Sequence, residues 1–583
     1  MTVLSRRTFA KVAAGASAGL ASAQSRRPPN VIIVMTDDQG YGDLSCHGNP
    51  VLKTPNLDRL HGQSVRFTNF HVDPLCSPTR SALMTGRYAA RTGVWATIGG
   101  RSLLRRDETT LANVFASAGY RTGIFGKWHL GDNYPFRPQE RGFGECLVHG
   151  GGGVGQTPDF WGNDYFDDTY FRDGRPESFR GYCTDVFFRE ALRFIERSRH
   201  RPFFLYLATN APHWPYRAPE TFIQPYRDKA ANEEMAAFYG MIANFDENMG
   251  RLLRRLDDWN LARDTILVFL TDNGTAAGIA GPPVSGFAGF NAGMRDRKGS
   301  PYEGGHRVPC FLRWPGGGLT GGRDIPHLAA HIDLMPTLIE LCKLKPPQGV
   351  LFDGRSLTPM LAGGVLPPYL QERELVVQVQ QRQENGRWMM DEPRPWIRSA
   401  VLTPQWRLID GAELYDIQAD PAQQEDRAAR HPEVVRRLRG VYEQWWQDVS
   451  FRFGEYNPIV LGSPREDPAR LTCMDWHGQI VPWNQPMVRG LPEANGFWAV
   501  EFEREGDYQF TLRHQPPEEE IPLRAAAAEV EVDGRRVTAP VPEGARSVTL
   551  RMRLPRGPAR LQTRLRERGG AERGAFYVDV QWG

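Results

Sequence analysis

The chain has 583 residues, 40% of them apolar and 24% charged, which is ordinary for a globular protein with ample core, and its length corresponds to roughly four domain equivalents. The 71 lysines and arginines nearly balance the 68 aspartates and glutamates, so the formal net charge is +3 and no nucleic-acid partner is expected. Seven cysteines are too few for a disulfide scaffold, and without a run of about 18 apolar residues we expect no stable membrane insertion.

The first 23 residues are predicted to be a twin-arginine signal peptide. Arg6 and Arg7 precede a weakly apolar run at residues 12–20, and the small residues 21–23, ASA, form a cleavage site. A disordered basic tail is the alternative, but the order of charge, apolar run and small residues favours export. Because such signals resemble those of bacterial proteins exported already folded, we expect a periplasmic or extracellular location.

Short apolar runs alternate with helical patterns over residues 29–455. Each run has the length and continuity of a strand that is buried on both faces. This alternation predicts a catalytic α/β domain with a mostly parallel central sheet flanked by helices, in which sites form beyond the carboxyl ends of the strands. The predicted strands are 31–35, 122–125, 202–208, 265–270 and 308–312, and helical patterns cover 185–197, 232–259, 328–341 and 432–448.

The pattern changes in the last quarter of the chain. Residues 456–482 are rich in proline and are predicted to be an irregular connector. From 483 to 583, short alternating runs separated by turn residues predict a C-terminal all-β domain resembling a sandwich. Its predicted strands are 496–503, 507–513, 527–532, 547–554, 561–565 and 575–581.

The segment CSPTRSALMTGR at residues 76–87 carries the densest chemical signal. Pro78 is suited to the first turn of a helix, which places Cys76 at the helix N-terminus, where free backbone N–H groups favour an anion. Arg80 lies about one helical turn further on and points back at the same place. The alternative for Cys76 is an inert, buried thiol, which is the usual fate of a free cysteine.

Acidic and amide side chains follow two of the predicted strands. Asp37 and Asp38 come directly after the first strand, and Asp272 and Asn273 follow the strand at 265–270. These are hard oxygen ligands, suited to Ca²⁺ or Mg²⁺ rather than to zinc. Aspartates at strand ends that merely begin turns are the alternative.

Four further basic residues lie near predicted strand ends or glycine-rich turns. Lys127 and His129 follow one strand, His213 follows another, and Lys298 precedes a PYEGG turn. Taken singly, a lysine is usually a solvated surface charge and a histidine is usually structural. Their significance depends on the motifs that contain them.

Those motifs resemble the type I, formylglycine-dependent sulfatases of the alkaline phosphatase superfamily. The resemblance runs from about residue 29 to about residue 426, with the motifs in the family's order, which makes the match highly specific. The motifs are VIIVMTDDQGYGD, TPNLDRL, CSPTRSALMTGR, GKWHLG, NAPHWPY, FLTDNG, KGSPYEGGHRVP, HIDLMPTL and ELYDIQADP.

The resemblance implies an arylsulfatase-like sulfuric ester hydrolase in which Cys76 is oxidised to formylglycine by a cytoplasmic maturation enzyme. It implies that the hydrated aldehyde attacks sulfur and that the cation, Ca²⁺ rather than Mg²⁺, is bound by modified Cys76 together with Asp37, Asp38, Asp272 and Asn273. Arg80 would help hold the nucleophile. Lys127, His213 and Lys298 would contact the sulfate, either His213 or Lys298 would protonate the leaving group, and His129 would be the base that releases sulfate.

Two alternatives to a sulfatase stay open at this point. A phosphonate or phosphate monoester hydrolase of the same superfamily could use the same site, because both anions are tetrahedral. A catalytically silent glycan-binding protein is disfavoured, since unused buried charges are costly. The substrate is expected to be a sulfated small molecule or glycan. The remaining cysteines, Cys46, Cys146, Cys183, Cys310, Cys342 and Cys473, show no metal-binding spacing.

Overall fold

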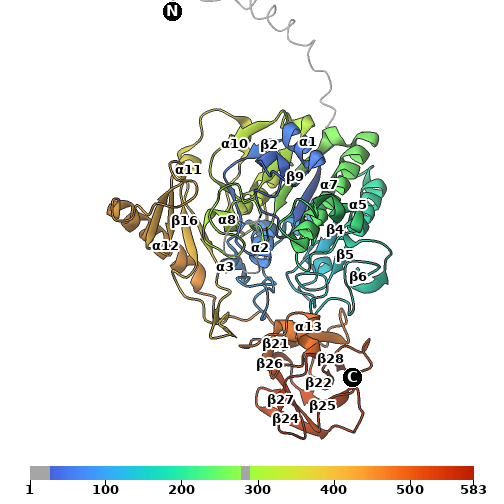
Figure 1. The fold of residues 1–583 in the computed structure, drawn as a ribbon. Helices are drawn as coiled ribbons and strands as arrows, with labels where there is room; N and C mark the ends of the chain where they lie inside the picture. The colour runs from blue at the N-terminus through green and yellow to red at the C-terminus, as the bar shows by residue number, and fades with distance from the viewer. Residues whose placement is uncertain (1–26, 278–288) are drawn as a thin grey trace, which may run out of the picture.

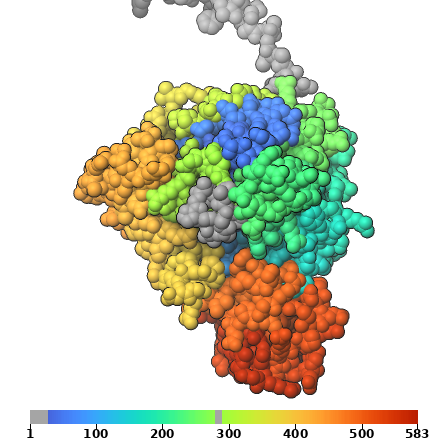
Figure 2. Space-filling view, viewed as in Figure 1, coloured from blue at the N-terminus to red at the C-terminus, as the bar shows by residue number. Residues whose placement is uncertain are grey.

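The structure is a computed structural model that describes residues 27–277 and 289–583. The predicted signal peptide, residues 1–23, lies outside this part of the chain. A large α/β body and a smaller lobe of β-strands follow one another along the sequence, and the space-filling view shows the lobe, coloured orange to red, at one end of the molecule (Figures 1 and 2).

A ten-stranded mixed sheet forms the centre of the α/β body. Its middle strands β9, β1, β8, β4 and β5 run parallel, while β10 is antiparallel to β9. All seven residues of β1 are buried, as expected of a strand covered on both faces. In spatial order the strands are β11 (Arg323–Ile325), β2 (Val65–Phe67), β10 (Cys310–Arg313), β9 (Thr265–Thr271), β1 (Asn30–Thr36), β8 (Phe203–Ala208), β4 (Arg121–Lys127), β5 (Glu145–His149), β6 (Thr169–Arg172) and β7 (Arg175–Ser178).

Helices cover both faces of this sheet. Helices α1 (Pro55–Gln63), α5 (Cys183–Ser198) and α7 (Glu233–Asp258) pack on one face, where Ile32 and Val34 of β1 point. Residues of α2 (Cys76–Thr85), α4 (Leu111–Ser117) and α9 (Leu334–Leu341) pack on the other, with Val31 and Ile33. The alternation of β1 between the two cores makes a three-layer α/β/α structure.

The helix expected at residues 328–341 begins later than the sequence indicates. Ala329 and Ala330 form the short strand β12, which pairs in parallel with β3 (Phe70–His71). The Asp333 carboxylate accepts the Ala330 backbone N–H at 2.7 Å, and α9 starts only at Leu334. Pairing with a strand far away in the sequence therefore overrides the helical periodicity.

A separate four-stranded antiparallel sheet belongs to the α/β body as well (Figure 1). Its order is β13 (Leu375–Gln378), β16 (Ser399–Leu402), β17 (Trp406–Ile409) and β18 (Glu413–Asp416), and α12 (Pro432–Ser450) packs on it through Leu438 and Tyr442. The shorter elements are α3 (Ala89–Thr92), α6 (Glu220–Ile223), α8 (Glu303–His306), α10 (Thr358–Ala362), α11 (Pro368–Gln371), β14 (Gln383–Glu384) and β15 (Arg387–Trp388).

The C-terminal lobe consists of two sheets that enclose one core. Trp498, Phe510, Val530 and Val578 are fully buried between them. One sheet has the order β19 (Ile459–Leu461), β21 (Phe497–Phe502), β26 (Gly557–Arg566), β23 (Ala527–Val532) and β24 (Arg535–Pro540), with β27 (Glu572–Arg573) paired to β26. The other has the order β20 (Ala469–Thr472), β28 (Tyr577–Trp582), β22 (Gly506–Arg513) and β25 (Val548–Leu554).

The predicted fold class is confirmed: a mostly parallel central sheet flanked by helices is followed by a sandwich-like all-β region. The segment 456–482 differs from the irregular connector expected, because it contains β19 and β20, which pair with β21 and β28. The domain boundaries at 455 and 482 stay predictions. In the described part of the chain, no helix is both long and apolar enough to cross a bilayer.

Candidate active site

The predicted site residues meet at the carboxyl edge of the central sheet. Asp37 and Asp38 directly follow β1, and Asp272 and Asn273 directly follow β9, which is the neighbour of β1. On the other side of β1, β8 leads to His213, and the next strand, β4, ends at Lys127. The polar residues that follow four parallel strands, β9, β1, β8 and β4, therefore lie close together, because the carboxyl ends of parallel strands meet at one edge of the sheet.

The carboxylates are connected by hydrogen bonds. The Asp38 backbone N–H donates to Asp272 Oδ1 at 3.1 Å, and Asn273 Nδ2 donates to Asp38 Oδ1 at 3.0 Å. Asp38 has a left-handed backbone conformation, with φ of 67°, which turns the chain sharply after Asp37. Such conformations persist where the surrounding structure imposes them, and they cluster at functional sites.

Two oxygen atoms of this group have no hydrogen-bond partner. Asp37 Oδ1 and Asn273 Oδ1 are buried and accept no hydrogen bond from the described residues, and Arg80 approaches Asp37 Oδ1 only to 4.0 Å. Burial, together with the charge of Asp272, raises the pKa of Asp37 well above its usual range. Single ligand atoms of Asp37, Cys76 and Asp272 all lie within 4.8 Å of one another. A hard divalent cation fits here, because it would bind the unpaired oxygens and offset the repulsion between the carboxylates.

Cys76 is the first residue of α2 and is only 2% exposed. Burial raises the pKa of its thiol to about 11, although Lys127 and Lys298 oppose the shift. At neutral pH the unmodified side chain is therefore a neutral thiol and not a thiolate, which makes it a poor nucleophile.

Arg80 lies one turn along α2, fully buried beneath Cys76. Its Nε and NH2 groups both donate to Asp272 Oδ2, at 3.1 and 2.7 Å, and NH1 donates to the Lys127 carbonyl at 3.2 Å. Arg80 thus ties the helix that carries Cys76 to the ends of β9 and β4.

Two lysines pair with the carboxylates that follow β1. Lys127 Nζ donates to Asp37 Oδ2 at 2.7 Å, and Lys298 Nζ donates to Asp38 Oδ1 at 2.5 Å. Burial disfavours charge on Asp38, but Lys298 and His213 outweigh it and hold the pKa of Asp38 below its usual range. Charge-assisted hydrogen bonds thus hold both lysines in place near Cys76.

His129 is buried, with φ of 60°, and the hydrogen bonds of its ring define its tautomer. Its Nε2 lies 2.9 Å from the Thr97 carbonyl, which can only accept, so Nε2 carries the proton. Burial and the charge of Lys127 lower the pKa of His129 well below its usual range, so the ring is neutral. The remaining lone pair on Nδ1 is buried and unpartnered in the described structure.

His213 has the opposite arrangement. Its Nδ1 donates to the Trp214 carbonyl at 2.6 Å, and Nε2 faces Asp38 Oδ2 at 3.8 Å. Burial lowers the pKa of His213 to about 3, although Asp38 opposes the shift. A glycine-rich loop packs on both histidines: a Cβ at Gly152 would lie 2.1 Å from His129 Cε1, so no side chain fits there.

The sequence did not reveal that residues beyond 482 reach this loop. The Gln485 backbone N–H donates to the Gly155 carbonyl at 3.1 Å, and Gln485 Oε1 accepts the Gly162 N–H at 3.0 Å. Gln485 opens α13 (Gln485–Arg489), which lies at the junction of the lobe and the α/β body (Figure 1). Contacts across more than 300 residues leave no local sequence signal.

Beside His213, the same segment helps to enclose a hollow of about 200 Å³. Trp214, which is 48% exposed, and Arg217 come from the α/β body, whereas Trp483 and Arg489 come from the segment beyond 482. Aromatic faces beside cationic groups suit an anionic organic ligand.

Oxygen side chains suited to a metal cation and three cationic side chains, Arg80, Lys127 and Lys298, lie near the buried Cys76. Such an arrangement is typical of an enzyme that acts on an anionic ester. The family model described as Sulfatase matches residues 29–344, more than half of the chain, and the chain belongs to the sulfatase family, within the alkaline phosphatase superfamily. The protein is therefore a sulfatase, an enzyme that hydrolyses sulfate esters.

Relatives and solved structures agree with this assignment. The chain is 33% identical to human (Homo sapiens) N-acetylgalactosamine-6-sulfatase over 380 residues, which cover 60% of this chain and 68% of the relative. It is 34% identical to human arylsulfatase A over 374 residues, with coverages of 60% and 70%. The crystal structure of Ps i-CgsB is similar, with a TM-score of 0.63, 26% identity and coverages of 74% and 95%.

Proposed function

We propose that the protein hydrolyses a sulfate monoester through a formylglycine derived from Cys76, assisted by a divalent cation. The cation, Ca²⁺ in preference to Mg²⁺, is held by Asp37, Asp38, Asp272 and Asn273, together with modified Cys76. The observation that carries the proposal is the pair of unpaired buried oxygens, on Asp37 and Asn273, in a cluster where Asp37 and Asp272 lie within 4.8 Å of Cys76. When bound, the cation supplies positive charge and polarises an oxygen.

The charges of the site favour an anionic substrate once a divalent cation is present. Three carboxylates face three cations, namely Arg80, Lys127 and Lys298, so these side chains balance. Both histidines are neutral, because burial lowers their pKa values. A divalent cation therefore leaves an excess of positive charge, which attracts a sulfate ester and stabilises charge that develops on its oxygens.

The chain's own residues divide the remaining tasks. Arg80 fixes the position of the start of α2 relative to Asp272. Lys127 and Lys298 are placed to contact the sulfate oxygens, and Lys298 or His213 protonates the leaving oxygen. The hydrated aldehyde supplies the attacking hydroxyl and a second hydroxyl whose deprotonation releases sulfate. His129 accepts that proton on Nδ1, the atom that the structure leaves with a free lone pair.

The test is to ask whether active protein carries an aldehyde at position 76. Peptide mass spectrometry should show the cysteine sulfur replaced by a carbonyl oxygen, and a hydrazide probe should label the same peptide. Cys76→Ala should fold and lose turnover of an aryl sulfate. Fully active protein with an alkylatable thiol at Cys76 would contradict the mechanism. Faster turnover of a matched aryl phosphonate than of the aryl sulfate would instead favour a phosphonate monoester hydrolase.

We further propose a sulfated saccharide as the substrate class. The hollow beside His213 offers Trp214 for stacking on a sugar face and Arg489 for a carboxylate or a second sulfate, whereas Arg217 already pairs with Asp164 at 2.6 Å. The similar protein Ps i-CgsB has been solved in complex with k-i-k-neocarrahexaose, with 25% identity and a TM-score of 0.63 to this chain. This likeness supports an oligosaccharide substrate without specifying which one.

The hollow can be tested separately from the chemistry. Arg489→Ala and Trp214→Ala should raise KM for sulfated oligosaccharides while leaving kcat/KM for a small aryl sulfate unchanged within about twofold, because neither residue contacts the reacting group. Glu493→Ala, a change outside the hollow, is the matched control. Equal losses on both substrates in the Arg489 and Trp214 variants would show that these residues act on the catalytic centre and not on saccharide binding.

We also propose that the protein is exported through its twin-arginine motif, in agreement with the charge and apolar pattern of residues 5–23. Export in the folded state would require Cys76 to be modified beforehand, by a cytoplasmic maturation enzyme that reaches it while the chain is extended. Replacing Arg6 and Arg7 by lysine should retain active enzyme inside the cell. Unchanged export of that variant would contradict the assignment.

A further inference from the structure

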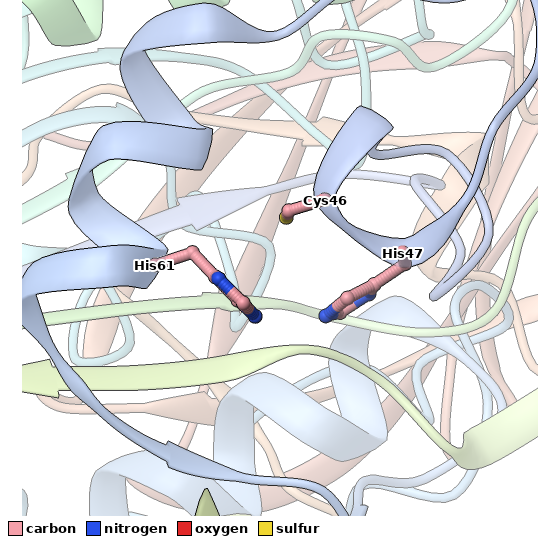
Figure 3. A group of neighbouring side chains, drawn as sticks. All are labelled: Cys46, His47 and His61. Carbon is pink, nitrogen blue, oxygen red and sulfur yellow. The ribbon is translucent and has the colours of Figure 1, made fainter. Parts of the chain in front are cut away.

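A second group of metal-binding side chains lies outside the active site. Cys46 and His47, in the short helix η1 (Ser45–His47), and His61, near the end of α1, each offer a ligand atom within 4.8 Å of the other two. The two imidazole rings point toward each other, with the sulfur of Cys46 next to the space between them (Figure 3). We call these three residues the Cys–His–His cluster.

The hydrogen bonds of His47 leave a free lone pair inside the cluster. His47 Nδ1 lies 2.8 Å from the Tyr41 carbonyl, which can only accept, so Nδ1 carries the proton and Nε2 has the lone pair. The Tyr41 ring also stacks on the His47 ring, with centroids 3.8 Å apart. A ring nitrogen that donates to a carbonyl while the other faces inward is the usual arrangement of a metal-binding histidine.

His61 is also engaged through Nδ1, so that Nε2 is the nitrogen left for a ligand. Its Nδ1 lies 3.2 Å from Arg66 NH1, while Arg66 Nε is bound to Asp324 Oδ1 at 2.6 Å. Coordination through Nε2 would place the proton on Nδ1, so Arg66 would give up its contact with His61 and keep Asp324. Arg66 therefore competes with a metal for this ring.

The other histidine cluster of the described structure provides a contrast. His71, Glu303 and His306 also lie within 4.8 Å of one another. Their ring nitrogens, however, are all engaged: the two Nδ1 atoms are 2.9 Å apart, His71 Nε2 bonds Asn69, and His306 Nε2 bonds the Pro301 carbonyl. In that group both nitrogens of each ring are engaged, although Glu303 Oε2 accepts no hydrogen bond from the described residues, whereas in the Cys–His–His cluster Nε2 of His47 keeps a free lone pair.

The donor set determines the kind of metal. One thiolate and two imidazoles suit zinc, unlike the oxygen ligands of the active site. With bonds of about 2.0–2.3 Å, ligand atoms of a tetrahedral zinc site lie about 3.4–3.6 Å apart, so a spread of up to 4.8 Å closes with side-chain movement of about 1 Å. Of the seven cysteines, Cys46 is the partly exposed one and the others are buried. Burial and the neighbouring Asp58 carboxylate raise the pKa of the Cys46 thiol, so the metal would have to displace its proton on binding.

We propose that Cys46, His47 and His61 bind one Zn²⁺ ion, with solvent as the fourth ligand. The ion would join η1 to α1. Because η1 follows Asp37 and Asp38 by fewer than ten residues, the site would anchor the loop that leads away from the catalytic carboxylates. The proposal does not depend on the catalytic mechanism, since the ligands and the metal are different.

The test uses the full chain in a Cys76→Ala background, which removes the other thiol that faces a metal site, and it is performed with saturating Ca²⁺. Co²⁺ should bind with one equivalent and give a thiolate charge-transfer band together with the visible bands of tetrahedral coordination, and Zn²⁺ should abolish both. Adding Cys46→Ser should remove the charge-transfer band. His61→Gln should weaken binding on the order of 100-fold or more, since loss of even an outer partner costs about 10–100-fold.

Two further variants keep the result interpretable. His327→Gln, which changes an exposed histidine elsewhere, should bind Co²⁺ as the parent does. Arg66→Gln should bind more tightly, because it removes the competitor for His61 and a nearby positive charge. The proposal is overturned if the folded parent takes up no Co²⁺ beyond saturating Ca²⁺, or if Cys46→Ser keeps the charge-transfer band. Weaker binding by Arg66→Gln would contradict coordination through Nε2 of His61.

Discussion

Two sets of buried charge in the same α/β body are built in opposite ways. Asp333, directly before α9, accepts a hydrogen bond from Arg373 on each carboxylate oxygen, both at 2.5 Å. The same carboxylate also accepts the backbone N–H groups of Ala330 and Arg355. At the sheet edge, Asp37 and Asn273 each keep an oxygen that accepts no hydrogen bond from the described part of the chain. Both sets are fully buried, so exposure to water does not explain the difference.

The difference separates a structural use of charge from a chemical one. A carboxylate whose oxygens are all satisfied is stable as it stands, and it has nothing left to offer a ligand. A cluster with unpaired oxygens and crowded carboxylates carries a cost that a bound cation offsets. Substitutions in the two sets should therefore have opposite signatures, loss of activity in one and loss of stability in the other.

The largest expected effect is that of Asp37→Asn on turnover. The change keeps the shape of the side chain but removes a charge that the cation needs, so kcat/KM should fall by on the order of 1,000-fold or more. The chain should remain folded, because the amide oxygen of asparagine can still accept from Lys127 and the substitution removes repulsion from Asp272. In parallel, saturating Ca²⁺ at 100 times its Kd should stabilise the parent by about 2.7 kcal/mol and the variant by less.

Activity assays and thermal unfolding with and without a chelator check both parts of this prediction. An Asp37→Asn protein that loses activity because it is unfolded would place Asp37 with the structural set. A parent enzyme that stays fully active after exhaustive chelation would remove the cation from the mechanism.

The two candidates for the proton donor should differ in how their loss depends on the leaving group. Lys298→Ala and His213→Gln should each lower kcat, and the one that removes the general acid should lose about 100–10,000-fold on substrates with poor leaving groups. With a nitrophenyl leaving group, which needs no proton, the loss should be much smaller. Because His213 Nδ1 is bonded to Trp214 and the ring is neutral, we expect Lys298 to show this dependence.

Plotting log kcat against leaving-group pKa for each variant gives the measurement. A steeper slope for His213→Gln than for Lys298→Ala would reverse the assignment. Equal slopes in both variants and the parent would mean that neither residue protonates the leaving oxygen and that both only bind sulfate.

The sequence predicts most of the active site because its residues lie where strands end. Asp37, Lys127 and Asp272 each sit at the close of a continuous apolar run, and a parallel sheet collects such ends at one edge. The motifs supply the rest, including Cys76 at the start of a helix. All ten predicted residues lie around one centre, although their catalytic roles stay proposals.

What the sequence misses depends on contacts between distant segments. His61 reaches Cys46 and His47 only because α1 packs beside η1, and adjacent ligands followed by one 14 residues later match no common zinc spacing. Gln485 reaches the loop at 152–163 only in the folded chain. For the same reason α9 begins later than the sequence predicts, since Ala329 pairs with Phe70 in a short strand.

The structural set predicts a stability effect with little catalytic change. Arg373→Met removes the partner of a fully buried carboxylate, and breaking one side of such a pair costs about 3–5 kcal/mol of unfolding free energy. Turnover per folded molecule at low temperature should stay near that of the parent, because in the described structure the side-chain hydrogen bonds of Arg373 go to Asp333 and not to an active-site residue. Denaturant unfolding together with active-site titration measures the two quantities, and unchanged stability would show that Asp333 tolerates losing its partner.

The smallest effect is expected where charges are paired but exposed. Arg430 and Glu425 form an ion pair at 2.7 Å, but their side chains are 67% and 48% exposed, so water screens the attraction and solvates either partner alone. Arg430→Ala should therefore change the unfolding free energy by less than about 1 kcal/mol and leave turnover untouched. Comparing Arg430→Ala with Arg373→Met under the same conditions shows how much of the stability loss depends on the burial of the ion pair that is broken. If both variants lost the same stability, burial would not be what distinguishes Asp333 and Arg373, and the contrast with the open carboxylates at the sheet edge would have to rest on their missing partners alone.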